Sequence, residues 1–428
     1  MKIKQVSAWE ILDSRGNPTV KATVTLENGV QGSAMVPSGA STGKYEAVEL
    51  RDNDLKRFNG LGVLTAVNNV NQQINKSLAG LSVEDQTKID QTMIDLDGTE
   101  NKSKLGANAI LAVSLAAARA ASMVANQPLY RYLTKFNPDF NGKYIMPIPQ
   151  FNVMNGGKHA NWATDIQEYM ILPTRTDSIT TAIRMAAEVY QNLKKVLKEK
   201  KYAISVGDEG GFAPAVSSNE EPFQLLSEAI TAAGYLLGKD ISFGIDSAAS
   251  EFFENGKYNL KKELAVLSGD QLIDFYSRLH DLYPIVSYED IFEQDDWESF
   301  QKFTQKYGKT AQIVGDDLYV TNVKRIQEGI NKNTTNSVLI KLNQIGTLTE
   351  TIDAILLARK YGMSVVVSHR SGETEDSFIA DLVVGLGTGQ IKTGAPCRGE
   401  RTAKYNRLME IELEQKGNIS YAEFPFRG

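Results

Sequence analysis

The chain has almost no cysteine: Cys397 is the only one in 428 residues. A single thiol excludes a disulfide within the chain and agrees with a reducing compartment. The sequence also lacks an uninterrupted apolar run of about 18 residues, the length that crosses a membrane. Its first residues lack the basic-then-apolar layout of a signal peptide. We therefore expect a cytoplasmic protein without a membrane partner.

The chain also has few histidines and only a small excess of negative charge. The formal net charge is only −6, from 46 basic and 52 acidic residues, which gives no electrostatic reason to expect nucleic acid as a partner. With three histidines and one cysteine, the sequence shows no ligand cluster for zinc. A small anionic substrate would therefore have to be held by local lysine and arginine side chains.

What the chain does have is the length and the patterning of two soluble globular domains. Residues 4–37 alternate apolar and polar positions between turn residues, which predicts a three-stranded antiparallel meander. Helical periodicity follows over about 62–78, 83–95 and 107–125. Turn-forming residues at 136–142 mark the expected boundary. We predict an N-terminal α+β domain over residues 1–138 and a second domain over residues 139–428.

The second domain contains six short apolar runs, each closed by a titratable residue. These residues lie 23 to 43 positions apart, about the length of a strand and a crossover helix. Helical patterns fill the gaps, near 178–199, 220–237, 268–282, 296–307, 347–361 and 399–415. This alternation predicts a (β/α) barrel, in which the strand ends open on one face. The residues expected to meet there are Asp246, Glu289, Asp316, Lys341, His369 and Lys392.

One of these runs, residues 337–346, is interpreted as a buried strand that contains a lysine. Desolvation disfavours an ammonium, so we expect the pKa of Lys341 to fall below its ordinary value of about 10.4. That would make Lys341 a candidate general base. The alternative is that Lys341 ends an edge strand and extends its ammonium into water.

Three carboxylates at successive strand ends suit Mg²⁺, which prefers oxygen ligands. We expect these ligands to be Asp246, Glu289 and Asp316. Around them stand candidates for a general acid and an anion clamp: Glu209 or Glu168 for the acid, and Arg370, Ser371 and Lys392 for the clamp. Taken alone, the 207–211 loop that carries Glu209 is more typical of an ordinary acidic turn than of a catalytic site. The whole set suits removal of a weakly acidic proton next to a carboxylate, because the resulting carbanion needs nearby cations.

Seven motifs along the chain resemble those of the enolase family. They are DSRGNPT at 13–19, PSGASTG at 37–43, NGG at 155–157, GDEGG at 207–211, VLIKLNQIGT at 338–347, SHRSGETED at 368–376 and IKTGAP at 391–396. The resemblance covers essentially the whole chain. It implies a small N-terminal α+β domain followed by an irregular (β/α)8 TIM-like barrel. It also implies Mg²⁺-dependent, reversible dehydration of 2-phospho-D-glycerate to phosphoenolpyruvate.

The resemblance further implies a role for each matching residue. Lys341 would take the C2 proton, and Glu209, with Glu168 beside it, would protonate the departing C3 hydroxyl. Asp246, Glu289 and Asp316 would bind a first Mg²⁺, and Ser41 would help to hold a second Mg²⁺ that arrives with substrate. Gln167, Ser368, Arg370, Ser371 and Lys392 would bind substrate, with Arg370 and Ser371 at its phosphate, while His159 and His369 complete the catalytic set. A homodimer is implied as well, and assembly to an octamer is left open.

Several positions depart from the family pattern: Ile291 replaces a usual proline, Gly399 replaces a common serine, Trp162 lies in the loop after His159, and Trp9, Lys21 and Glu410 replace the usual Arg, Glu and Arg. None removes a catalytic group. Two other functions stay open. A related enzyme acting on sugar acids would need a different clamp from the Ser-His-Arg-Ser segment. A catalytically silent binding protein of the same fold would be expected to lose charged residues at the barrel mouth.

Overall fold

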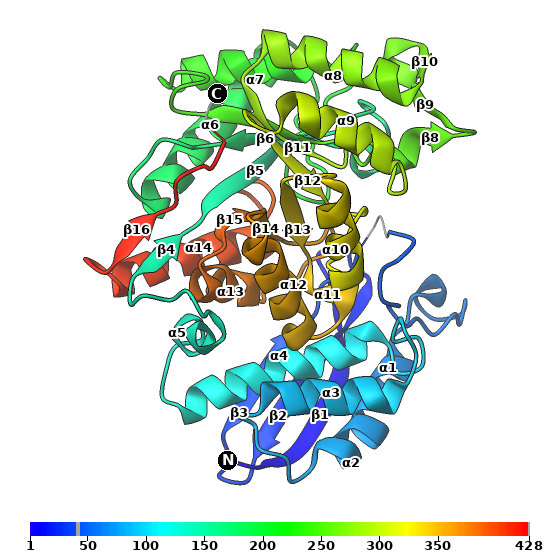
Figure 1. Cartoon of the computed structure of the whole chain (residues 1–428), viewed down its shortest axis with the longest axis vertical. Coiled ribbons are helices and arrows are strands. Elements are labelled where there is room, and N and C mark those ends of the chain that lie inside the picture. The colour runs from blue at the N-terminus through cyan, green and yellow to red at the C-terminus, as the bar shows by residue number, and fades with distance from the viewer. Residues whose placement is uncertain (40–42, 427–428) are drawn as a thin grey trace.

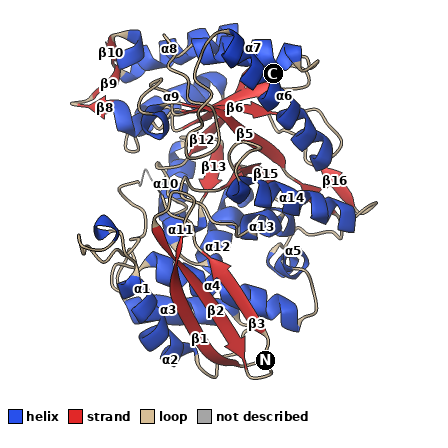
Figure 2. Ribbon diagram, turned by 180° about the vertical axis from the view of Figure 1, so that it is seen from behind, coloured by secondary structure: helices blue, strands red, loops and turns tan. Residues whose placement is uncertain are grey.

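The N-terminal part of the chain forms a three-stranded antiparallel sheet covered by helices. A computed structural model describes residues 1–39 and 43–426 and shows this sheet at the end of the molecule opposite the chain's barrel (Figures 1 and 2). The strands are β1 (Ile3–Leu12), β2 (Pro18–Leu26) and β3 (Gln31–Met35), in the order β1-β2-β3. The helices are α1 (Leu64–Asn69), α2 (Asn75–Leu78), α3 (Gln86–Asp97), α4 (Ala107–Val124) and α5 (Leu129–Leu133), and a π-helical turn, Val70–Ile74, joins α1 to α2. The predicted meander and α+β class are confirmed.

Helix α4 is the central element of this part. By length and composition it is the one helix among the described residues that could cross a membrane, but 83% of it is buried inside the protein. Its alanines pack against β2 and β3, and small side chains let a helix approach a sheet closely. An apolar helix enclosed in this way is a core helix.

The rest of the chain forms a closed barrel of eight strands, in the order β11-β12-β13-β14-β15-β5-β6-β7. Seven strands run in one direction, whereas β6 is antiparallel to both neighbours. The strands are β5 (Ile148–Asn155), β6 (Glu168–Leu172), β7 (Ser242–Asp246), β11 (Ile285–Glu289), β12 (Gln312–Gly315), β13 (Ser337–Ile340), β14 (Ser364–Ser368) and β15 (Gly389–Lys392). This arrangement confirms the irregular TIM-like barrel.

Helices surround the barrel (Figure 1). They are α6 (Ile179–Glu199), α7 (Glu221–Ala232), α8 (Gly269–Leu282), α9 (Trp297–Tyr307), α10 (Val323–Lys332), α12 (Leu348–Lys360), α13 (Phe378–Leu386) and α14 (Gly399–Glu414). Side-chain caps define several of their first turns: Ser268 and Gln271 form a capping box on α8, and Asp296 caps α9. Such caps satisfy backbone N–H groups that a helix leaves unpaired, so they fix where each helix begins.

The prediction of one strand over residues 337–346 is wrong. Strand β13 ends at Ile340, Lys341 is the first residue beyond it, and Leu342–Ile345 form the short helix α11. Gly346 ends that helix with a φ of 96°, a left-handed conformation that suits glycine. Apolar residues in so short a run do not distinguish a strand from a helical turn.

Other elements had no sequence prediction. Helix α13 is buried along its whole length, so it shows no amphipathic period, and α10 was also missed. Barrel strand β5 and helix α5 had no prediction either. The smaller additions are β4 (Tyr144–Met146), which pairs with β16 (Ile419–Tyr421), and a separate sheet of β8 (Phe253–Glu254), β9 (Lys257–Leu260) and β10 (Ala265–Leu267).

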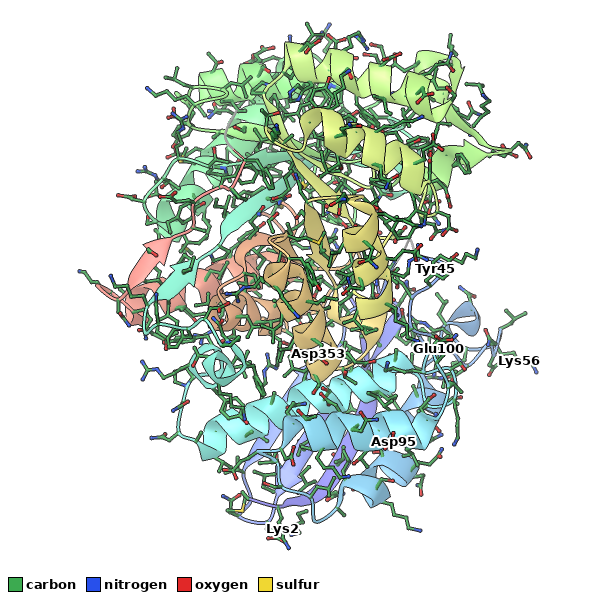
Figure 3. All side chains as sticks on the ribbon, viewed as in Figure 1. Lys2, Tyr45, Lys56, Asp95, Glu100 and Asp353 are labelled. Carbon is green, nitrogen blue, oxygen red and sulfur yellow. The ribbon has the colours of Figure 1, made fainter. Side chains whose placement is uncertain are left out.

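The N-terminal part is attached to the barrel mouth by hydrogen bonds. Ser38 and Gly372 exchange two backbone hydrogen bonds of 2.7 and 2.9 Å, and the N–H of Ala47 donates to the carbonyl of Gln344 at 2.8 Å. The hydroxyl of Tyr45, which Figure 3 labels, lies 3.0 and 3.1 Å from the carboxylate oxygens of Asp295. The segment after β3 therefore reaches over the strand ends of the barrel.

We predict that Gly32→Ala destabilises the protein through the contact between β3 and α4. A Cβ on Gly32 would lie 2.2 Å from the N of Ala120 and 2.4 Å from the O of Ala116, both backbone atoms of a helix that cannot easily move. Overpacking of this kind costs about 1–3 kcal/mol, so the melting temperature and the urea midpoint should both fall.

The matched control is Gly399→Ala, because its Cβ would meet no atom within 4 Å and α14 begins there. This variant should match or exceed the wild-type melting temperature. Equal melting temperatures for Gly32→Ala and the wild type would show that α4 can retreat from the sheet.

Candidate active site

A small cavity lies at the barrel mouth, among residues at or beyond the ends of the parallel strands. Glu168 reaches the same mouth from the first residue of β6, because that strand runs in the opposite direction. The lining residues are Gln167, Glu168, Glu209, Asp246, Ala248, Asp290, Asp316, Asp317, Lys341, Ser368, His369, Arg370, Ser371 and Lys392. The structure thus brings together most of the residues that the sequence singled out.

Lys392 is the hub of the first charge network. Its Nζ lies 2.9 Å from Asp246 Oδ2, 2.9 Å from Glu289 Oε1 and 3.0 Å from Glu168 Oε2. The strand register produces this arrangement, since Glu168 pairs with Asp246 and Asp246 pairs with Glu289 across β6, β7 and β11. Three carboxylates around one ammonium leave an excess of negative charge in a buried place.

The pKa values of this network reflect that excess. Burial raises the pKa of Glu168, and the charge of Glu209 raises it further. Burial and the charge of Asp246 do the same to the pKa of Glu289. Burial alone would lower the pKa of Lys392, but the surrounding carboxylates outweigh burial and raise it. The lysine therefore stays charged.

Lys341 does not have the lowered pKa that the sequence predicted. Its ammonium contacts the carboxylate of Asp316. Burial alone would lower the pKa of Lys341, but the charge of Asp316 outweighs burial and raises it. The same contact holds the pKa of Asp316 below its ordinary value in spite of burial. The prediction of a lowered pKa was wrong because the burial of a lysine can be inferred from the sequence pattern. The carboxylate that contacts it in the folded chain cannot be inferred in this way.

The carboxylates form a group suited to a divalent cation. Asp290, Asp316 and Asp317 each offer an oxygen within 4.8 Å of the others, and Asp246 and Glu289 lie on the neighbouring strands. Burial and the charge of Asp316 raise the pKa of Asp317 to about 8. These carboxylates are hard oxygen donors, and a bound cation would relieve the repulsion between them. The group therefore fits Mg²⁺.

Asp290 and Asp317 were missed by the sequence analysis. Asp290 has a φ of 41°, unusual for a side chain with a Cβ. Its carboxylate accepts the backbone N–H groups of Asp316 and Asp317, both at 2.8 Å. It therefore holds the end of β12 against the end of β11. Each of the two missed residues directly follows a predicted ligand, and that adjacency was the available signal.

Glu209 lies beside His369 on the other side of the cavity. Its Oε2 accepts a hydrogen bond from Nδ2 of Asn152 at 2.8 Å and lies 3.5 Å from Nε2 of His369. Burial lowers the pKa of His369 to about 4, although the charge of Glu209 opposes that shift. A neutral imidazole therefore faces the predicted general acid at neutral pH.

Arg370 is held by a residue of the N-terminal part. Its Nη1 and Nη2 donate to the two carboxylate oxygens of Glu46 at 2.9 and 3.1 Å, and Nη1 also lies 2.9 Å from Oδ1 of Asn343. Glu46 was not predicted from the sequence, because it lies far from Arg370 in the chain. A paired guanidinium of this kind can bind an anion only if it shares or exchanges its partner.

Two family descriptions match the chain. Residues 3–133 match the description "Enolase, N-terminal domain", and residues 143–427 match "Enolase, C-terminal TIM barrel domain". The chain belongs to the enolase family. Enzymes of the enolase superfamily use a lysine or histidine base together with one or two Mg²⁺ ions, and the carboxylate group of this enolase-family site is compatible with that cofactor.

The structure places the remaining predicted residues only in part. Ser41 lies outside the described residues, and His159 is described by its backbone alone, in the short helical turn Gly157–Ala160. Gln167 is buried at the cavity wall, and its Oε1 accepts no hydrogen bond from the described residues. Such an atom is available to a ligand. Of the departures from the family pattern, Ile291 is fully buried and so belongs to the core of the enolase barrel.

We predict that His369 titrates near pH 4. Its folded pKa lies below the unfolded value of about 6.5, so the unfolded chain binds more protons between these values. Stability should therefore fall as the pH drops from about 6.5 towards 4, by roughly 3 kcal/mol at the low end. NMR titration of the histidine ring signals measures this directly, and His369→Gln assigns the signal. A midpoint near 6.5 would contradict the buried, neutral ring.

Proposed function

We propose that the protein is an Mg²⁺-dependent enolase that interconverts 2-phospho-D-glycerate and phosphoenolpyruvate. The observation that carries the proposal is one cavity that holds a lysine, Lys341, and a carboxylic acid, Glu209, supplied by different elements. Dehydration next to a carboxylate needs such a pair, because one group removes the C2 proton and another protonates the leaving hydroxyl.

Asp246, Glu289 and Asp316 would hold the Mg²⁺, with Ser41 serving a second ion. The bound cation would supply positive charge that offsets the negative charge developing on the substrate carboxylate. Lys392 contributes a fixed ammonium to the same region, since the carboxylates around it keep it protonated.

Lys341 is the proposed base, and its contact with Asp316 sets a condition on that role. While this contact persists, the ammonium keeps its proton. Lys341 can therefore accept the C2 proton only when Asp316 interacts less strongly with it than in this structure. Glu209 is the proposed acid. Arg370 and Ser371 would bind the phosphate, which requires Arg370 to share its guanidinium with Glu46.

We further propose that the protein has a glycolytic role in the cytoplasm. It would act there as a homodimer on a small-molecule substrate. A silent binding protein of this fold would bind ligand without turnover, and a sugar-acid enzyme would leave 2-phosphoglycerate unchanged. Turnover of 2-phosphoglycerate, which the two following experiments measure, would separate the proposed function from both alternatives.

We predict that proton abstraction and hydroxide loss can be separated by mutation. Glu209→Gln should still exchange the C2 hydrogen of 2-phosphoglycerate with solvent deuterium while forming product about 10²–10⁴-fold more slowly. Lys341→Ala should lose both activities, because the exchange itself needs the base. Exchange is followed by NMR and product by its ultraviolet absorbance. The control is Lys302→Ala, on the exposed face of α9, where the lysine side chain is 44% exposed. Normal exchange by Lys341→Ala would show that another group is the base.

We also predict that activity requires the carboxylate ligands and a divalent metal. Exhaustive chelation should abolish product formation, and Mg²⁺ should restore it. Glu289→Gln removes one buried ligand charge and should weaken Mg²⁺ binding by roughly 10–100-fold or more, measured by calorimetry alongside turnover. Glu298→Gln, whose side chain is 77% exposed, is the control. Full activity of Glu289→Gln after chelation would end the metal proposal.

A further inference from the structure

Arg401 of α14 is a fully buried cation that contacts His369, a residue of the cavity wall. It is 0% exposed, and its Nη1 lies 2.6 Å from Nδ1 of His369. A guanidinium only donates hydrogen bonds and does not lose its proton in proteins. Nδ1 of His369 must therefore be the acceptor, which places the proton of the neutral ring on Nε2.

The protonated Nε2 faces Glu209. It lies 3.5 Å from Oε2, the same oxygen that accepts a hydrogen bond from Nδ2 of Asn152 at 2.8 Å. Asn152 makes the hydrogen bond to Oε2, whereas Nε2–H of His369 is too far from it for a hydrogen bond and faces the carboxylate as a nearby positive dipole. Glu209 carries the proton that the proposed acid must donate. After the proton has gone, both N–H groups stabilise the remaining charge.

We propose that Arg401 is a positioning residue that fixes His369 in the Nε2–H tautomer, so that the ring presents an N–H to Glu209 and stabilises its carboxylate after the acid proton has been donated. The inference rests on the proposed role of Glu209 as general acid. Arg401 acts only through its contact with the imidazole ring of His369.

The charged groups around His369 agree with a neutral ring. Glu209 and Glu373 favour the imidazolium, whereas burial and the charge of Arg401 oppose it and prevail. A doubly protonated ring would also direct its Nδ1–H at the guanidinium of Arg401. Both the imidazolium and the Nδ1–H tautomer are therefore disfavoured by the same contact.

A purely structural role for Arg401 is the competing explanation. Its guanidinium also donates to the carbonyl oxygens of Arg370 and Ser371, each at 2.6 Å, and of Asp208 at 3.1 Å. These bonds tie the segment after β14 to the 207–211 loop. A test must therefore read the proton on His369, and loss of activity alone is not sufficient.

The first measurement uses the wild-type protein labelled with ¹⁵N-histidine, at neutral pH and without substrate. The three histidines of the chain give a spectrum that His280→Gln and His369→Gln can assign. We expect the ¹⁵N shifts of His369 to show a bare Nδ1 and a protonated Nε2. An Nδ1–H tautomer or an imidazolium would overturn the proposal.

The second measurement compares Arg401→Met with Lys404→Met. Lys404 lies one turn along α14, is equally buried and donates to Glu373 at 2.8 Å, so its loss reproduces the loss of a buried cation. Arg401→Met should give mixed tautomers of His369 and slow product formation at least about tenfold more than C2 exchange. Lys404→Met should keep the wild-type tautomer. The same tautomer in both variants, or the same change in both, would refute the role of Arg401.

If Arg401→Met does not fold, Arg401→Gln takes its place, because an amide can accept as well as donate and mixed tautomers are again expected. A wild-type tautomer in that variant would count against the proposal. The inference and the proposed function fail separately. An Nδ1–H tautomer of His369 would refute the role of Arg401 even if the protein turned over 2-phosphoglycerate. Absence of that turnover would refute the proposed function, and the NMR spectrum would still report the tautomer.

Discussion

Repulsion between buried carboxylates is the constraint on which the barrel mouth depends. Asp246, Glu289 and Glu168 share the ammonium of Lys392, and Asp316 contacts that of Lys341. Few like charges can be kept together away from water without partners. The two lysines are therefore structural as well as chemical groups. A divalent cation would enter a site that already has the negative charge to hold it.

The N-terminal part completes this site. Glu46 orients Arg370, and hydrogen bonds from Ser38 and Ala47 attach the same segment to the barrel. Arg119 of α4 adds an ion pair to Asp376, with distances of 2.5 and 2.7 Å. Because these contacts lie within or beside the anion clamp, separating the two parts of the chain would also dismantle the clamp. The smaller part is thus a component of the site.

Much of the architecture could be predicted from the sequence, because the spacing of the strands and the periodicity of apolar residues are visible in the linear sequence. The meander, most outer helices and six of the strands were recognised by those signals. Helix α13 could not be, since burial on all sides removes the amphipathic period. The residues at the site were largely predicted from their positions at strand ends and from the family motifs. Their partners were not: the contact of Lys341 with Asp316, or of Arg401 with His369, joins segments 25 and 32 positions apart and depends on side-chain direction.

The reversed strand β6 has a consequence for how the barrel mouth is built. Since β5 and β6 are antiparallel neighbours, residues 156–167 connect them directly across the mouth, without the crossover helix that joins parallel strands. This connection lies between two strands whose ends are fixed, and its last residue, Gln167, adjoins Glu168. Its buried Asp165 accepts hydrogen bonds from Nδ2 of Asn219 and from the backbone N–H groups of Lys261 and Lys262, at 2.8 to 3.0 Å, which attach the connection to segments outside the barrel strands. In this barrel, one wall of the mouth is therefore built by a short connection whose conformation depends on segments outside the barrel strands.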